Sequence, residues 1–420
     1  MKNNIGRSII VLHVRKHAAE IDWILPLIYK FNYKINLVTI FNNKECYKSL
    51  LSNKSLYKLW HSICSNYYIE NSDNIFFYKI LFKIILLLEK IGFKKNIIKE
   101  YILNKIYNLD KLKIFLKIKS HEIKFLFLAW NNYSYWANIF RKINSNIFII
   151  RFPESNHIWS YTSSIKKFLK NTNYKKLPCD LYLSSNVSSL ISFFGEINRP
   201  NIDLGYMKYE KNWIEKINGK IIKDDYFFNI AVATRPFFHG VYKKPYFSSS
   251  SYYYLIDSIM KIAAKIKNAR VFFKVHPNSQ DEEILKKALD KYKSIKWKIV
   301  HEHLFCLAKR SDVCISFYSS AVLDFLACQK PTIEFWRSDI DNIDLIYDRL
   351  NKKYSSIYNK LGLVFSASDY MQLSKLIYMI YEKKADKIIL FQKQRFTNKI
   401  LSHLIAKRKK FEQLKNIIKV

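Results

Sequence analysis

Two segments in the second half of the chain carry the residues best suited to chemistry. The first, Arg270–Asn278, is an apolar run that stops at Pro277 and leaves Lys274 and His276 near its end. Proline ends a ladder of strand hydrogen bonds and forces a turn, so we expect His276 at the rim of a sheet, within reach of a ligand. A single His in a loop is usually incidental, so this segment needs support from others.

The second segment is a short buried strand that leads into a serine-rich turn. Val313–Ser316 continues through Tyr318, Ser319 and Ser320 into a helix with periodic apolar residues. A serine at this point can cap the helix. The first helical turn also offers free N–H groups and a positive dipole potential, and hydroxyls beside it complete a phosphate site. Capping alone and phosphate binding both explain the two serines.

A third segment brings an arginine to the same place. The strand Phe227–Thr234 is followed by Arg235, whose guanidinium suits bidentate phosphate binding. Ligands of open parallel sheets bind beyond the carboxyl ends of the strands, and we expect the strands of the first two segments to be neighbours. The predicted anion site consists of Arg235, Lys274, His276, Pro277, Ser316, Tyr318, Ser319 and Ser320.

Short apolar runs alternate with helical stretches along the whole chain, which is typical of βαβ units and parallel sheets. Predicted strands are Ile9–Val14, Ile35–Ile40, Phe125–Ala129, Ile147–Arg151, Asp180–Ser184, Phe227–Thr234, Val271–Val275, Val313–Ser316, Thr332–Phe335 and Leu363–Ser366. A Pro-containing segment from Arg199 interrupts the alternation. We therefore predict an α/β fold of two Rossmann-like domains facing a cleft: an N-terminal domain at 1–205, a linker at 206–225, a C-terminal domain at 226–385 and a helical tail at 386–420.

An insertion at about 55–120 interrupts the first domain, and its sequence predicts helix throughout. Lysines are mixed with its apolar residues: Lys83, Lys90, Lys94, Lys95 and Lys99. Such a helix can lie on an anionic membrane face, or it can be an ordinary surface helix with a buried apolar stripe. The sequence leaves both interpretations open. No apolar stretch reaches the roughly 18 residues of a spanning helix, so we predict no transmembrane segment.

Composition limits the class of protein. With 420 residues and 49% hydrophobic residues, the chain can bury two cores. The net charge of +37 comes largely from lysines spread along the chain. Asn, Ile, Tyr and Phe are abundant as well, and this combination is what coding DNA rich in A and T would produce. Attraction to an anionic surface is the other explanation. A nucleic-acid-binding protein is the non-enzymatic alternative, but the sequence has no helix-turn-helix, finger or RNP signature, and we expect no nucleic-acid partner.

The six cysteines are far apart and show no metal-like spacing. They suit a reducing cytoplasm, and the apolar run near the N-terminus is too short for a signal peptide. We expect a cytoplasmic protein that can attach peripherally to the inner face of the plasma membrane.

Together, His276-Pro277 and Ser319-Ser320 resemble the HP and SS motifs of GT-B-fold bacterial glycosyltransferases, which include sialyltransferases, capsule and Kdo transferases and CDP-glycerol glycerophosphotransferases. The run Asp312–Trp336 looks most like the last group. The resemblance covers roughly 226–370, and Asp203–Tyr206 resembles the linker between the family's domains. It implies that His276 and the two serines contact the phosphate or ribose of a nucleotide and that Asp324 orients their loop.

The resemblance implies a glycosyltransferase that moves a sugar from a CMP-, CDP- or UDP-activated donor, bound by the C-terminal domain, to a surface polysaccharide such as capsule or to a lipid-linked acceptor. Polyol-phosphate transfer of the CDP-glycerol type would use the same donor site and is the alternative. A sugar epimerase of similar shape would need paired carboxylates or His in the cleft. Glycerophosphotransferases tend to carry His-Gly after a late strand of the first domain, where this sequence has Arg151–His157.

An inverting transfer needs a general base, for which strand ends of the first domain offer candidates. These are Glu154, His157, His17, Glu20 and Asp22. Glu154 is preferred because a Pro turn holds it at a rim facing the cleft. No DxD motif stands in a suitable position, and Asp224-Asp225 in the linker is typical of a solvated turn. Hydroxyls, the helix dipole and His276 would meet the charge of the leaving group, so we predict a reaction without metal or cofactor.

Overall fold

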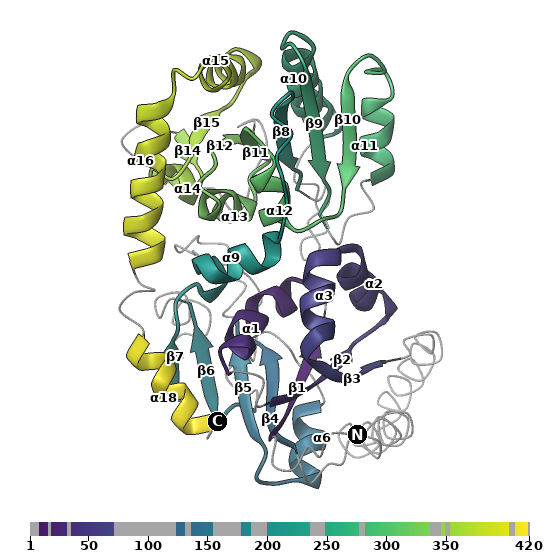
Figure 1. Cartoon of the computed structure of the whole chain (residues 1–420), viewed down its shortest axis with the longest axis vertical. Helices are drawn as coiled ribbons and strands as arrows, with labels where there is room; N and C mark the ends of the chain where they lie inside the picture. Colours follow the sequence, from purple (N-terminus) through teal and green to yellow (C-terminus); the bar gives the residue numbers. More distant parts are fainter. Residues whose placement is uncertain are drawn as a thin grey trace, which may run out of the picture.

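The computed structural model describes residues 8–15, 18–31, 35–70, 123–130, 136–153, 178–185, 200–235, 248–276, 282–336, 346–348, 353–402 and 408–418. In Figure 1 they form two domains stacked along the long axis of the molecule, with helix α9 (Lys211–Asn218) between them. The lower domain comes mainly from the first half of the sequence, and the upper domain comes from the second half.

The lower domain contains a seven-stranded sheet with the order β3-β2-β1-β4-β5-β6-β7. Its strands pair in parallel throughout. The chain starts inside the sheet at β1 and moves outward first to one edge and then to the other, which is a doubly wound topology. The strands are β1 (Ser8–Val14), β2 (Ile35–Phe41), β3 (Cys64–Ile69), β4 (Ile123–Ala129), β5 (Phe148–Phe152), β6 (Leu181–Ser184) and β7 (Asn201–Asp203).

The upper domain repeats this plan with a six-stranded parallel sheet in the order β10-β9-β8-β11-β12-β15. The strands are β8 (Phe228–Ala233), β9 (Ala269–Lys274), β10 (Lys296–Val300), β11 (Val313–Ser316), β12 (Thr332–Phe335) and β15 (Phe365–Ala367). A separate antiparallel pair, β13 (Ile346–Asp348) and β14 (Lys353–Ser355), belongs to the same half of the chain. The predicted fold class, two parallel α/β domains, is confirmed.

Successive side chains of a strand point to opposite faces of the sheet, and in the central strands the side chains on both faces are apolar. Helices therefore cover both faces of each sheet. In β1, Ile10 and Leu12 pack toward α1, whereas Ile9 and Val11 pack toward α6. The helices of the lower domain are α1 (Ala19–Lys30), α2 (Lys44–Ser52), α3 (Lys54–Ile63) and α6 (Trp136–Ile143). Those of the upper domain are α10 (Ser249–Ala264), α11 (Glu282–Leu289), α12 (Leu304–Lys309), α13 (Ala321–Ala327), α14 (Ile357–Lys360) and α15 (Tyr370–Tyr381).

Every strand that we predicted is present, with ends shifted by at most two residues. Five described strands were not predicted: β3, β7 and β10 of the two large sheets, and the separate pair β13 and β14. Each lies at the edge of its sheet. An edge strand leaves one side unpaired and is often polar or lysine-rich, so its apolar signal is weak. The exposed residues of β3 and the lysines of β10 illustrate this.

The prediction that 55–120 is helical throughout is wrong at its start. Helix α3 is followed directly by β3, which pairs in parallel with β2. The remainder of that segment, including the five lysines considered for membrane binding, lies outside the described residues.

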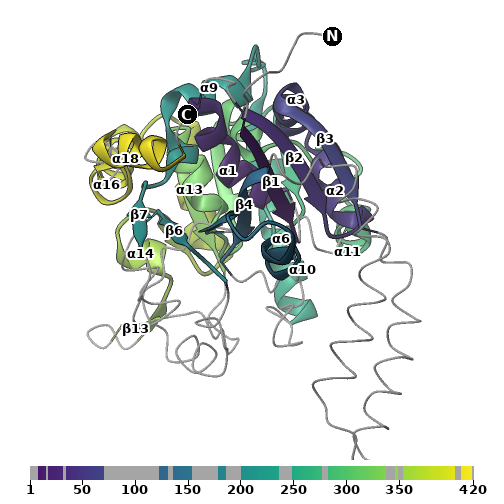
Figure 2. The same cartoon turned by 90° about the horizontal axis from the view of Figure 1, so that it is seen from below.

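The segment between the sheets runs from the end of β7 to the start of β8 and contains the short helix η4 (Met207–Tyr209) and α9. The C-terminal helices then return along one side of the molecule, as Figures 1 and 2 show. Helix α16 (Asp386–Phe396) packs on the upper domain, where Gln392 bonds both backbone groups of Thr332. Helix α18 (Arg408–Ile418) packs on the lower domain, where Phe411 stacks on Phe31 at 5.7 Å. The tail therefore contacts both domains.

The domain boundary is itself an apolar interface. One continuous hydrophobic cluster joins Ile21 and Trp60 of the lower domain to Phe305 and Leu326 of the upper domain. Within the described part of the chain, no helix has the length and hydropathy required to cross a bilayer.

Candidate functional site

The carboxyl ends of four neighbouring inner strands, β9, β8, β11 and β12, lie along one end of the upper sheet, which we call the rim. Lys274 ends β9, Thr234 and Arg235 follow β8, and Ser316 ends β11. We expected the strands of the His276 segment and the serine segment to be direct neighbours, and this is wrong. Strand β8 lies between β9 and β11. That intervening strand carries Arg235, so the guanidinium lies between the other two segments.

The turn from β11 to α13 is held by its own serines. The Ser316 hydroxyl accepts a hydrogen bond from the Ser319 N–H at 3.1 Å, and the Ser319 hydroxyl accepts one from the Ala321 N–H at 3.4 Å. Ser320 occupies the N-cap position, but its side chain makes no capping bond. Ser316 and Ser319 therefore shape the turn, whereas the Ser320 hydroxyl is not used for capping.

Tyr318 connects this turn to Arg235. Its φ of 53° lies in the left-handed region, which is strained for a bulky residue. The Tyr318 carbonyl accepts a hydrogen bond of 2.5 Å from Arg235, whose guanidinium lies 4.8 Å from the centre of the Tyr318 ring. The Trp336 ring packs beside the Tyr318 ring, with 6.2 Å between the ring centres. Arg235 is thus positioned over the serine turn.

Lys274 supplies a second cation at the rim. Burial lowers its pKa to about 8, and its ammonium donates a hydrogen bond to the carbonyl of His301 at 3.3 Å. His276 is half-buried two residues further along. Pro277 lies outside the described residues.

Glu334 is a member of the rim that sequence reasoning missed. It lies in β12 directly beside Ser316 of β11 and is completely buried. Burial raises its pKa to about 7, although the Ser356 hydroxyl donates a hydrogen bond to Oε2 and Arg235 is close enough to favour the charged form. Oε1 has no hydrogen-bond partner in the described part of the chain. A lone carboxylate in an otherwise apolar strand was the signal that could have identified it.

A buried ionic cluster lies where the two domains meet. Lys208 of η4 contacts Asp22 of α1 at 2.8 Å and Asp324 of α13 at 2.7 Å. His303, the N-cap of α12, lies 3.0 Å from the other oxygen of Asp22. All four side chains are at most 11% exposed. The cluster therefore joins the linker to both domains.

The two carboxyl groups of this cluster differ in pKa: that of Asp22 is lowered and that of Asp324 is raised. Burial opposes ionisation of Asp22, but Lys208 and His303 hold the pKa of Asp22 well below its usual range. Burial raises the pKa of Asp324, and Lys208 offsets this only in part. The structure places Asp22, a candidate base, and Asp324, expected to orient the serine loop, on the same lysine. Neither carboxylate is open to a ligand in this arrangement.

The other candidate bases belong to the lower domain. Glu20 is completely buried, and its carboxylate accepts a hydrogen bond from the Arg15 N–H at 2.9 Å. Glu154, His157 and His17 lie outside the described residues. A pair that we did not predict, His13 and Glu70, lies at the carboxyl ends of β1 and β3 with a separation of 3.3 Å. Glu70 also accepts a hydrogen bond from the Trp136 indole.

No group of three or more His, Cys, Asp or Glu side chains with metal-binding geometry occurs among the residues that the structure describes.

Neither the family models nor the curated proteins match this sequence. Solved structures do match its fold. A UDP-N-acetylglucosamine 2-epimerase has a TM-score of 0.55 at 11% identity, covering 92% of this chain and 90% of that one. The UDP-GlcNAc 2-epimerase from Neisseria meningitidis, bound to UDP-GlcNAc, has a TM-score of 0.55 at 12% identity, covering 98% and 100%. The wall teichoic acid polymerase TagF has a TM-score of 0.52 at 13% identity, covering 100% and 90%. At these identities the likeness establishes the two-domain GT-B fold alone.

Proposed function

We propose that this chain is a glycosyltransferase that moves a sugar from a CMP-, CDP- or UDP-activated donor to a polysaccharide or lipid-linked acceptor. The observation that carries the proposal is the convergence of Arg235, Lys274 and the serine turn on one edge of a parallel sheet. This edge is where open α/β sheets bind their ligands.

The rim offers what a departing nucleotide phosphate requires. Arg235 is fixed by the Tyr318 carbonyl and ring, so a phosphate would meet a preorganised guanidinium. Lys274 adds a second positive charge, and Ser320 adds a hydroxyl that capping does not use. His276 would complete the site as a hydrogen-bond donor. Glu154 remains our first choice as the base, followed by His157 and Glu20.

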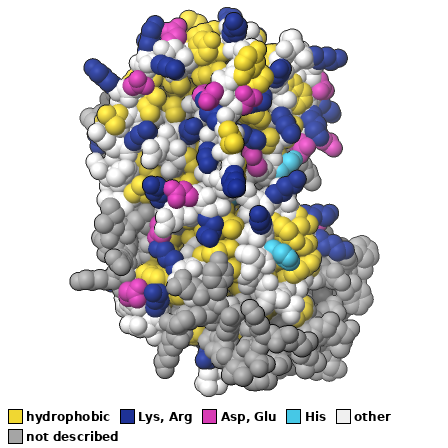
Figure 3. Space-filling model, viewed as in Figure 1, with side chains coloured by type: hydrophobic (Ala, Val, Ile, Leu, Met, Phe, Trp, Pro, Cys, Tyr) yellow, Lys and Arg dark blue, Asp and Glu magenta, His cyan; other side chains and the backbone are white. Residues whose placement is uncertain are grey.

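Polyol-phosphate transfer is the second candidate, since the likeness to TagF extends over 100% of this chain. It would use the same rim with a CDP-linked donor. The epimerase alternative requires paired carboxylates or His in the cleft. Lys208 binds both Asp22 and Asp324, so this alternative would use His13 and Glu70 at the carboxyl ends of β1 and β3. The nucleic-acid alternative requires one basic face. In Figure 3, Lys and Arg side chains are instead spread over the visible face, with hydrophobic and acidic ones between them.

A thermal-shift titration with CMP, CDP, UDP, GDP and ADP tests the donor site. A ligand at one hundred times its dissociation constant stabilises a protein by about 2.7 kcal/mol, which gives a visible shift. We expect one pyrimidine nucleotide to shift the wild type more than the purine nucleotides do, and this excess shift to be lost in Arg235→Ala and in Ser320→Ala. Lys267→Ala, an exposed residue away from the rim, is the matched control and should shift normally. If no nucleotide shifts the wild type while DNA does so at low salt, the proposal fails.

Product analysis separates the enzymatic alternatives. UDP-GlcNAc incubated alone would yield an epimer only with an epimerase. Transfer of glycerol phosphate from CDP-glycerol, without transfer from any nucleotide sugar, would establish the second candidate instead of the first.

A further inference from the structure

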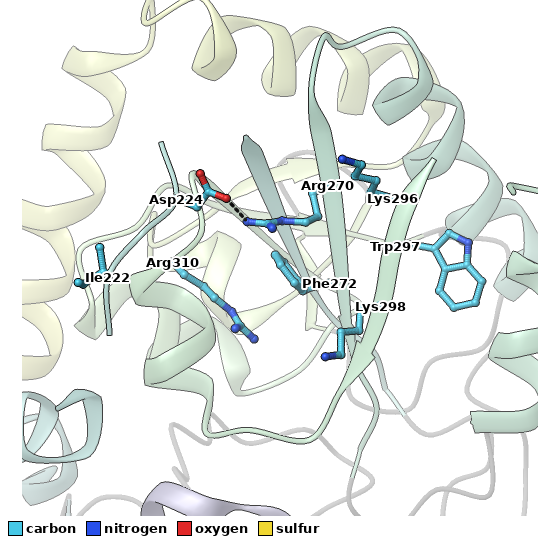
Figure 4. A pocket seen from close by; sticks show the side chains of 8 residues that line it. All are labelled: Ile222, Asp224, Arg270, Phe272, Lys296, Trp297, Lys298 and Arg310. Carbon is cyan, nitrogen blue, oxygen red and sulfur yellow. Dashed lines mark ion pairs between the residues drawn. The ribbon is translucent and has the colours of Figure 1, made fainter. Parts of the chain in front are cut away.

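A cavity of about 430 Å³ lies at the opposite end of the upper sheet from the rim. Its lining combines Arg270 of β9, Lys296 and Lys298 of β10, and Arg310 at the C-terminal end of α12 with the ring of Phe272 (Figure 4). Asp224 is its acidic lining residue. The volume is within the range of small-molecule sites, roughly 300–1,000 Å³.

Strand register brings these cations together. Lys296 pairs with Arg270 and Lys298 pairs with Phe272, so the two lysines share one face of the sheet with both β9 side chains. Trp297, between the lysines, points to the other side (Figure 4). Arg310 reaches the same face from α12.

The two arginines are held in place. The Arg270 Nε donates a hydrogen bond of 2.9 Å to the buried Asn229, and the Arg270 guanidinium lies 4.3 Å from the centre of the Phe227 ring and 3.6 Å from Asp224. The Arg310 guanidinium lies 4.6 Å from the centre of the Phe272 ring and forms an ion pair with Glu302. Such fixed guanidiniums lose little freedom when they bind a ligand.

The cavity has an excess of positive charge. Asp224 and Glu302 are the acidic partners of the two arginines, whereas Lys296 and Lys298 have no ion pair with any described residue. Burial lowers the pKa of Arg310, and the nearby charge of Arg270 lowers it further. Lysines on an edge strand also prevent edge-to-edge pairing, which is reason enough for Lys296 and Lys298. Protection of an edge strand does not explain why Arg270 and Arg310 converge on the same cavity, because neither arginine lies on an edge strand.

We propose that this cavity is a second anion site, which binds a ligand with two or more phosphate groups. The guanidiniums match phosphate oxygens with paired donors, and the lysines add point charges at the mouth. Arg270 is the second residue of β9 and Lys274 is the last, so these two residues of the cavity and the rim are about 13 Å apart along the strand. The site is therefore separate from the donor rim, and it does not depend on the proposed transfer reaction.

Calorimetric titration of the full chain with inorganic pyrophosphate tests this. We expect Lys296→Glu/Lys298→Glu to weaken binding roughly tenfold or more, which is about 1.4 kcal/mol or more. Lys267→Glu/Lys287→Glu carries the same change in charge at exposed positions outside the cavity and should bind within about twofold of the wild type. Pyrophosphate bound at the rim would appear as a separate event that Arg235→Ala weakens, whereas the event that requires Lys296 and Lys298 should be unchanged in that variant. Circular dichroism checks that each variant is folded.

Three results would overturn the site: no measurable binding to the wild type, equal weakening in the charge-matched control, or loss of all binding in Arg235→Ala with binding unchanged in Lys296→Glu/Lys298→Glu. Vesicles of equal parts cardiolipin and phosphatidylcholine then identify the source of the phosphates. Sedimentation that requires Lys296 and Lys298 assigns the site to a lipid headgroup. Pyrophosphate binding without sedimentation assigns it to a soluble phosphorylated molecule.

Discussion

At the residue scale, Glu334 places a carboxyl group in an edge that otherwise carries cations. Its pKa is raised by burial from an ordinary 4.5 to about 7, so near neutral pH the folded protein holds this proton about half of the time. A neutral Glu334 leaves the positive charge of Arg235 available to a phosphate, whereas an ionised one competes with it. The proton on this residue therefore affects both stability and the proposed donor site.

Glu334 should make stability fall as the pH rises from about 4.5 to 7. Across this interval the folded state binds more protons than the unfolded state, so the free energy of unfolding falls as the pH rises. The fall ends once the pH passes the pKa of Glu334 in the folded state. The pKa difference between the unfolded and folded states corresponds to a loss of roughly 3 kcal/mol in the free energy of unfolding. Urea unfolding at pH 5 and pH 7.5 measures this, with Glu334→Gln as the comparison.

Glu334→Gln removes the titration and nearly preserves shape, so its stability should change less with pH than that of the wild type. The difference between the two proteins isolates this residue from the histidines that titrate in the same range. Parallel curves for the two proteins would contradict the raised pKa.

At the element scale, the β11–α13 turn depends on hydroxyl groups rather than glycine. Ser316→Ala should lower the free energy of unfolding by about 1–3 kcal/mol, because the Ser319 N–H loses its buried partner. Nucleotide affinity should weaken with it, since the turn positions Tyr318 and, through it, Arg235. Denaturant unfolding and calorimetry measure the two effects.

Ser320→Ala is the matched control in the same turn. Its hydroxyl makes no capping bond, so stability should change by less than about 0.5 kcal/mol while nucleotide affinity falls. If Ser320→Ala destabilised the protein as much as Ser316→Ala, the division of roles between these serines would be wrong.

At the scale of the whole molecule, Lys208 bridges the two domains through ion pairs with Asp22 and Asp324. Lys208→Met leaves the buried carboxylates of Asp22 and Asp324 without their shared cation and should cost about 3–5 kcal/mol. Urea unfolding followed by tryptophan fluorescence measures the loss. Lys211→Ala removes an exposed ion pair of the neighbouring helix and should have no measurable effect.

Adding Asp22→Asn and Asp324→Asn to Lys208→Met removes the uncompensated charges and should restore part of the stability. A triple variant no more stable than Lys208→Met would show that the cost comes from lost packing and not from buried charge.

The sequence by itself determined the doubly wound architecture and the strands that carry the rim. Apolar periodicity depends on residues a few positions apart, so it identified β8, β9, β11 and β12 and the polar groups at the ends of the first three, but not Glu334 of β12. It failed at the sheet edges, because β3, β7 and β10 need not be apolar on both faces.

Only the tertiary structure decided which polar groups meet. Asp22 and Lys208 are 186 positions apart, and His303 is 281 positions from Asp22. Nothing local marks them as partners, because their contact depends on how the two domains pack. The same holds for Arg270 and Arg310, which the register of β9 and β10 and the end of α12 bring to one cavity. Local pattern specifies elements, whereas sites that combine elements arise from their packing.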